Sequence, residues 1–197
     1  PYTNPRVEKT FKLWKDLIDK GYFNDNANQL TYIDVLPYLY RKKGAMYLMG
    51  NIVISQIPEL LKSNIGYFPF PKIAPKVPQY EEAPLDILFI PKQSKHKAAA
   101  KVVLAFLSNP GILDRYNIAA GYLSPNINSK VNDDPFVQKT TQHLKSSAGF
   151  SYFFNRNNPP ELGRPGTKLL GRFISTPNIK STIQEFEKLR SKLRNEK

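Results

Sequence analysis

The residues that could hold a small ligand begin with a short apolar run, GAMYLMGN, which ends at Gly50 and Asn51. A strand that ends there, just before a helix, would present backbone N–H groups able to hold ligand hydroxyls or an anion. An ordinary buried strand ending in a turn is the alternative. Asp86 lies within another apolar run, where a lone carboxylate needs a polar partner. These positions favour recognition of a polar molecule over covalent chemistry.

A second candidate group lies in the stretch SYFFNRNNPPELG. Tyr152, Phe153 and Phe154 offer flat ring faces, and Asn155 and Arg156 offer side chains that can form paired hydrogen bonds. Aromatic faces beside polar groups suit a small polar ligand such as a sugar. The alternative, equally open from residue types alone, is that the rings belong to the core and Arg156 makes a structural ion pair.

The residues that most often carry catalysis or bind metals lack suitable partners nearby in the sequence. His96 lies in a lysine run, and His143 has no acid four residues away, so surface positions are expected for both. The two acids at 133–134 precede a predicted helix, where a capping role is expected. The two acids at 81–82 lie in a proline-rich stretch and are expected to be solvated. We therefore predict no catalytic residue, no metal site and no enzyme activity.

Sequence motifs for nucleotide binding and for hydrolysis are absent as well. The chain has no G-x-G-x-x-G, G-x-x-x-x-G-K or G-x-S-x-G pattern. It also has no cysteine, which excludes thiol catalysis, disulfides and thiolate metal sites. We expect no cofactor.

The chain carries a net charge of +13, from 29 basic and 16 acidic residues. Such a charge could attract nucleic acid. The basic residues are spread along the sequence, however, and no predicted helix has a dense basic stripe with interleaved aromatics. A solvated basic surface is the favoured interpretation, so no nucleic-acid partner is expected. A basic interaction or nucleic-acid-binding protein is kept as the alternative function.

Helices are indicated by capping residues and by apolar residues three or four positions apart. Asn4 and Pro5 start the first helix, and Gly21 stops it. Further helices are predicted at 34–41, 52–61 with a break at Pro58, 94–108, 134–145, 168–174 and 181–194.

Two short apolar runs bracketed by glycine or proline, Ala45 to Met49 and Leu85 to Ile90, are predicted strands, the second of them buried. Residues 66–84 are rich in proline and predict a strand end followed by a long irregular connection. Residues 117–125 are expected to form a loop. The alternation of strands and helices favours an α/β class, and the shortage of strands suggests that part of the fold is missing.

Four stretches carry a family resemblance: KKGAMYLMGNIV, IGYFPFPKI, APLDILFIPKQSKHKAAAKVVLAFLSNP and YFFNRNNPPELG. In order and spacing they resemble the periplasmic solute-binding proteins of ABC importers, in the extracellular family 1 that includes the maltose-binding type. The resemblance covers nearly the whole chain. It implies a periplasmic-binding-protein type II fold, of which this chain would be the C-terminal half.

The resemblance also implies how the chain is shared between two lobes. Residues 1–70 and 122–197 would belong to the C-terminal lobe, and residues 71–121 would return to the N-terminal lobe. The first half of the N-terminal lobe would be absent.

In this family, GAMYLMGN would be the strand whose end reaches the ligand cleft. Ile52 stands where the family commonly has an aromatic residue that stacks on a sugar ring, so Tyr152 or Phe154 would supply the stacking face. The expected ligand-binding residues are Gly50, Asn51, Ile52, Asp86, Tyr152, Phe154, Asn155 and Arg156.

The function that the resemblance implies is capture of a small solute, most simply a sugar or related polyol, between two lobes. Closure would follow binding, and the closed receptor would deliver its ligand to the membrane permease of an ABC transporter. The expected location is the periplasm, or a lipid anchor on the outer face of the cytoplasmic membrane. The full-length protein is expected to be a monomer.

Overall fold

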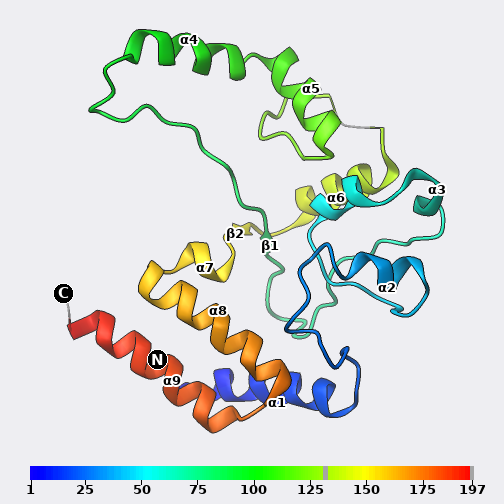
Figure 1. Ribbon diagram of the computed structural model, residues 1–197, viewed down its shortest axis with the longest axis vertical. Helices are drawn as coiled ribbons and strands as arrows, with labels where there is room; N and C mark the ends of the chain where they lie inside the picture. The colour runs from blue at the N-terminus through cyan, green and yellow to red at the C-terminus, as the bar shows by residue number, and fades with distance from the viewer. Residues whose placement is uncertain (131–132, 196–197) are drawn as a thin grey trace. The chain divides into compact units, whose positions relative to one another are not determined.

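The computed structural model describes residues 1–130 and 133–195, which are mostly helical and include a short two-stranded sheet (Figure 1). The chain divides into two compact units. Pro1–Asp34 and Ser151–Lys197 make up what we call the terminal unit, and Val35–Phe150 make up the central unit. This division differs from the lobe segments 1–70, 71–121 and 122–197 implied by the resemblance, which stay a prediction.

The terminal unit is built from helices, and its first helix forms as its capping residues predict. The side chain of Asn4 accepts a hydrogen bond from the backbone N–H of Arg6, and Pro5 occupies the first helical position. Gly21 follows the helix with a left-handed backbone, φ +69°, which glycine adopts without strain. The helices of this unit are α1 (Pro5–Asp19), α7 (Phe154–Asn157), α8 (Pro160–Ser175) and α9 (Ile179–Asn195).

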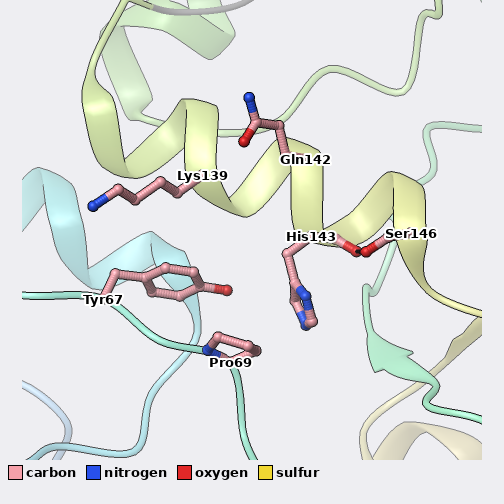
Figure 2. Close-up of a pocket in the computed structure, with 6 residues that line it drawn as sticks. All are labelled: Tyr67, Pro69, Lys139, Gln142, His143 and Ser146. Atoms are coloured by element: carbon pink, nitrogen blue, oxygen red, sulfur yellow. Dashed lines mark hydrogen bonds between the residues drawn. The ribbon is translucent and has the colours of Figure 1, made fainter.

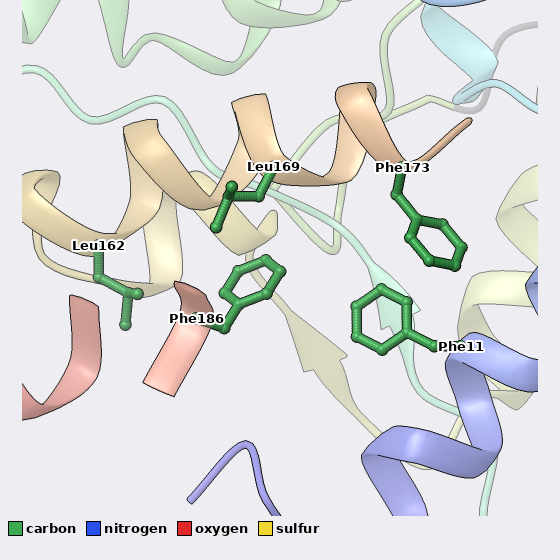
Figure 3. Packing of buried hydrophobic residues seen from close by; sticks show 5 residues of the cluster. All are labelled: Phe11, Leu162, Leu169, Phe173 and Phe186. Carbon is green, nitrogen blue, oxygen red and sulfur yellow. The ribbon is translucent and has the colours of Figure 1, made fainter. Parts of the chain in front are cut away.

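The core of the terminal unit lies between α1, α8 and α9 (Figure 3). Rings dominate it: those of Phe11 and Phe173 meet edge to face with centroids 4.9 Å apart. The helix predicted at 181–194 is confirmed as part of α9, and its Ile183, Leu189 and Leu193 pack against this cluster. The buried members of the cluster are Phe11, Leu162, Leu169, Phe173 and Phe186.

The central unit contains shorter elements, and α6 packs against the 3-10 helix η1 there. Ile54 of η1 and Val137 of α6 are both buried. The predicted break at Pro58 is confirmed, since a new helix begins just after it. The elements are α2 (Leu36–Tyr40), η1 (Asn51–Gln56), α3 (Glu59–Lys62), β1 (Glu81–Glu82), α4 (Lys97–Leu107), α5 (Pro110–Ala120) and α6 (Pro135–Ser146). The unit ends at Phe150, the first residue of β2 (Phe150–Ser151).

The two predicted strands, Ala45 to Met49 and Leu85 to Ile90, are wrong. Both segments are irregular, and Ile87 and Phe89 are 71% and 79% exposed where a buried strand was expected. A strand needs hydrogen-bonded neighbours, and in residues 1–130 and 133–195 the only ladder joins β1 and β2. Within the described chain, these apolar runs therefore form no hydrogen-bonded pair with another strand. The predicted α/β class holds only in a coarser sense, because the structure combines helices with one small sheet.

Helix α5 occupies residues where the sequence analysis expected a helix stop followed by a loop from 117. The Asn109 side chain accepts hydrogen bonds from the N–H groups of Gly111 and Ile112, and Gly121 ends the helix with φ +70°. Asn109-Pro110 repeats the Asn4-Pro5 signal, so the helix was readable from the sequence. Across the part of the chain that the structure describes, no helix is long and apolar enough to cross a membrane.

Candidate ligand-binding site

Gly50, Asn51 and Ile52 form the start of η1 on the surface of the central unit. Gly50 is extended (φ −66°, ψ 159°), and its carbonyl accepts from the N–H of Val53 at 3.2 Å. Asn51 is half-buried, whereas the Ile52 side chain is 41% exposed. The expected order of an apolar run, Gly-Asn and then a helix is confirmed, although the run is not a strand. An apolar side chain therefore stands at the surface beside an extended glycine.

Asp86 lies on the surface of the irregular segment that replaces the second predicted strand. Its neighbours Leu85 and Ile87 are exposed too. The expected buried setting of Asp86 is therefore wrong, since its carboxylate is not desolvated.

The predicted site residues at 152–156 lie in the terminal unit, where some belong to the core and others are exposed. Phe154 packs edge to face on Phe186, with centroids 6.0 Å apart, and so contributes to the core. Tyr152 is 42% exposed, and Asn155 and Arg156 of the one-turn helix α7 are exposed as well. Of the two residues expected to stack on a ligand, Tyr152 is the more exposed.

The predicted site residues thus belong to different units. The set at 50–52 and 86 lies in the central unit, and the set at 152–156 lies in the terminal unit. Whether the two sets act together on one ligand stays a prediction.

A pocket that the sequence analysis did not anticipate lies in the central unit (Figure 2). It has a volume of about 320 Å³. Its helical wall comes from one face of α6, where the contributing residues are three, four and seven positions apart. The opposite wall is the segment that follows α3. The lining residues are Tyr67, Pro69, Lys139, Gln142, His143 and Ser146.

His143 is held in this pocket by an acid that is distant in the sequence. Its Nε2 lies 2.7 Å from Oε1 of Glu81, and its side chain is 18% exposed. Gln79 Nε2 donates to the same carboxylate oxygen at 3.2 Å. The expectations of a surface histidine and a solvated acid at 81 are therefore wrong. Because a carboxylate only accepts, His143 Nε2 carries the shared proton, and Nδ1 is left for another contact.

Tyr67 completes the polar wall of the pocket as a neutral phenol. Burial raises its pKa, and the negative charge of Glu81 raises the pKa further. The hydroxyl therefore stays protonated at neutral pH and can both donate and accept hydrogen bonds.

The sequence signal for this pocket is the polar stripe Lys139, Gln142, His143 and Ser146 on a helix whose other face is apolar. The partners from residues 67–81 give no local signal, because they are brought to α6 by the fold. His96, by contrast, is exposed as expected. Within residues 1–130 and 133–195, no cluster of three or more His, Cys, Asp or Glu could hold a metal ion.

Comparison with known proteins gives a family match over residues 2–112. The matching model is that of the bacterial extracellular solute-binding proteins. The match covers more than half of the chain and includes the residues at 50–52 and Asp86. Neither the curated proteins nor the solved structures contain a significant match.

Proposed function

The chain belongs to the bacterial extracellular solute-binding protein family, and on this premise we propose that it is the substrate-binding receptor of an ABC importer. The observation that carries the proposal is the family match over residues 2–112. The proposed activity is reversible binding of a solute outside the cytoplasmic membrane, in the periplasm or on a lipid anchor, without catalysis.

The proposed ligand is a sugar or a related polyol. Tyr152 supplies an exposed ring that can stack on the apolar face of a sugar, and Asn155 and Arg156 supply donors for its hydroxyls. Ile52 supplies an exposed apolar contact at the family's aromatic position. An aliphatic side chain there removes one stacking face, so the stacking contribution shifts to Tyr152.

The proposed mechanism is ligand capture between two lobes. Residues 1–70 and 122–197 are proposed to belong to the C-terminal lobe, and residues 71–121 to the N-terminal lobe. A ligand that contacts both lobes binds the closed state more tightly than the open one and therefore increases its population. The closed receptor then docks on the transporter permease.

A thermal-shift screen against sugars, polyols, sugar phosphates and amino acids tests the receptor proposal. A ligand present at 100 times its Kd stabilises a protein by about 2.7 kcal/mol, which raises Tm by several degrees. Tyr152→Ala should reduce the shift produced by the active ligand. The matched control is Tyr22→Ala, which removes another exposed tyrosine ring of the terminal unit. A folded chain that responds to no compound in the screen would contradict the proposal.

A further inference from the structure

We propose that the pocket between α6 and residues 67–69 is a separate binding site for a small hydroxylated carboxylate, such as a sugar acid. The proposal goes beyond the receptor function and does not depend on it. It stands on the polar residues of α6 that line, with Tyr67 and Pro69, an open surface pocket of about 320 Å³ (Figure 2). Ligand sites begin at about 300 Å³, so the pocket suits a small molecule.

The charge of the pocket favours a single negative charge on the ligand. Lys139 is exposed at the pocket wall and makes no ion pair within residues 1–130 and 133–195. Glu81 is already engaged by His143 and Gln79. One available ammonium group balances one carboxylate, and the nearby Glu81 charge repels a phosphate dianion more strongly than a monoanion. The arrangement therefore favours a monovalent carboxylate over a dianion.

The remaining groups of the pocket suit hydroxyls, because they include both donors and acceptors. The Tyr67 hydroxyl can both donate and accept. His143 Nε2 contacts Glu81, which leaves Nδ1 available for a further hydrogen bond. The Ser146 hydroxyl donates to the His143 carbonyl at 2.8 Å, so its oxygen can still accept. A polyhydroxylated chain can satisfy such a mixed set.

Calorimetric titration of the 197-residue chain with gluconate and with sorbitol tests this assignment. The two probes share a hydroxylated six-carbon chain, and only gluconate has a carboxylate. Ionic strength is held constant with sodium chloride. We expect gluconate to bind about tenfold or more tightly than sorbitol, since a charged hydrogen bond is lost with the neutral probe.

Matched lysine variants locate the binding. Lys139→Gln should weaken gluconate binding about tenfold or more. Lys145→Gln removes the same charge from the last turn of α6, outside the pocket lining, and should change binding less than about twofold. Absence of gluconate binding, equal binding of sorbitol, or equal effects of the two variants would overturn the proposal. The receptor proposal is tested separately, by Tyr152→Ala and the solute screen, so its failure can be told apart from failure of the pocket proposal.

Discussion

Asp134 combines two stabilising interactions in one side chain. Its carboxylate accepts from the backbone N–H groups of Phe136 and Val137, at 2.8 and 3.4 Å, and it forms an ion pair with Lys62 at 2.8 Å. Burial pushes the pKa of Asp134 upward, but the Lys62 ammonium and the two N–H donors outweigh it, so the pKa is lowered. The expected capping role of this acid is confirmed, and the ion pair ties α6 to α3.

Replacing Asp134 should separate these two roles. Asp134→Ala removes cap and charge and should lower the free energy of unfolding by about 1–2 kcal/mol. Asp134→Asn keeps a capping oxygen and should cost less than about 1 kcal/mol. Urea unfolding measures both. Asp133→Ala, at the exposed neighbouring acid, should be nearly neutral. Equal losses for the alanine variants at 133 and 134 would contradict the capping role.

Glu187 should make the terminal unit sensitive to acid. Hydrogen bonds from the Arg190 side chain and from the Tyr2 backbone N–H lower its pKa to about 2. Because the folded pKa lies below the ordinary 4.5, the stabilisation is complete above pH 4.5 and is lost as the pH falls toward 2.

The measurement for Glu187 is Tm as a function of pH between 2 and 6. Glu187→Gln should flatten the acid limb of the curve. Glu161→Gln removes an exposed carboxylate from the first turn of α8. This control should change the fall of Tm at low pH less than Glu187→Gln does. An unchanged acid limb in Glu187→Gln would show that the contact does not contribute.

Contacts between residues close in the sequence could be predicted, whereas contacts between distant residues could not. The Asp134 cap is visible locally, because an acid precedes a proline and a helical pattern. His143 and Glu81 are 62 residues apart, whereas the spacing patterns of helices and strands relate only residues a few positions apart. Tertiary contacts of this kind could not be predicted from residue types.

Two of the three glycines in helix α8, Gly166 and Gly171, differ in their surroundings and therefore offer a matched test. A Cβ at Gly166 would lie 2.7 Å from Phe154 Cε1 and 2.9 Å from Phe186 Cε1, whereas a Cβ at Gly171 would meet nothing within 4 Å. Gly166→Ala should destabilise by about 1–3 kcal/mol through overpacking. Gly171→Ala should stabilise by about 0.5–1 kcal/mol through helix propensity. Chemical unfolding measures both, and a stabilised Gly166→Ala would contradict the close packing at Gly166.

Helices were predicted better than strands, because helical hydrogen bonds are local and strand hydrogen bonds are not. α1, α6 and α9 follow from caps and apolar spacing. The runs at 45–49 and 85–90 have strand-like composition, but within the described chain they lack the neighbours that would make them strands. The composition of these runs therefore favoured strands, which the structure does not form there.

Exposed apolar surface in the central unit should make the chain associate. Leu88 and Phe89 line an apolar groove with Val103 and Leu104 of α4, and Phe89 is 79% exposed. Contiguous apolar surface of this kind promotes contacts between molecules. We expect an apparent mass that rises with concentration in analytical ultracentrifugation.

A serine at position 89 should reduce this association. The matched control is Leu60→Ser, which removes an exposed apolar side chain from α3, outside the groove. A monomer at all concentrations, or equal effects of the two variants, would contradict a role for the groove.

At the scale of the whole molecule, the family was predictable from sequence stretches, whereas the binding roles of the site residues stay a prediction. Gly50, Ile52 and Tyr152 lie at the surface. Phe154 instead packs in the core, which residue types alone could not decide. The solute and the lobe arrangement depend on contacts that no single stretch specifies.

The most direct test of the receptor account is a calorimetric titration of the chain with the solute that gives the largest thermal shift. The account predicts saturable binding of one molecule per chain, reversible on dialysis and with the solute recovered unchanged. A folded chain that binds no sugar or polyol, or that converts its ligand into a product, would contradict the account.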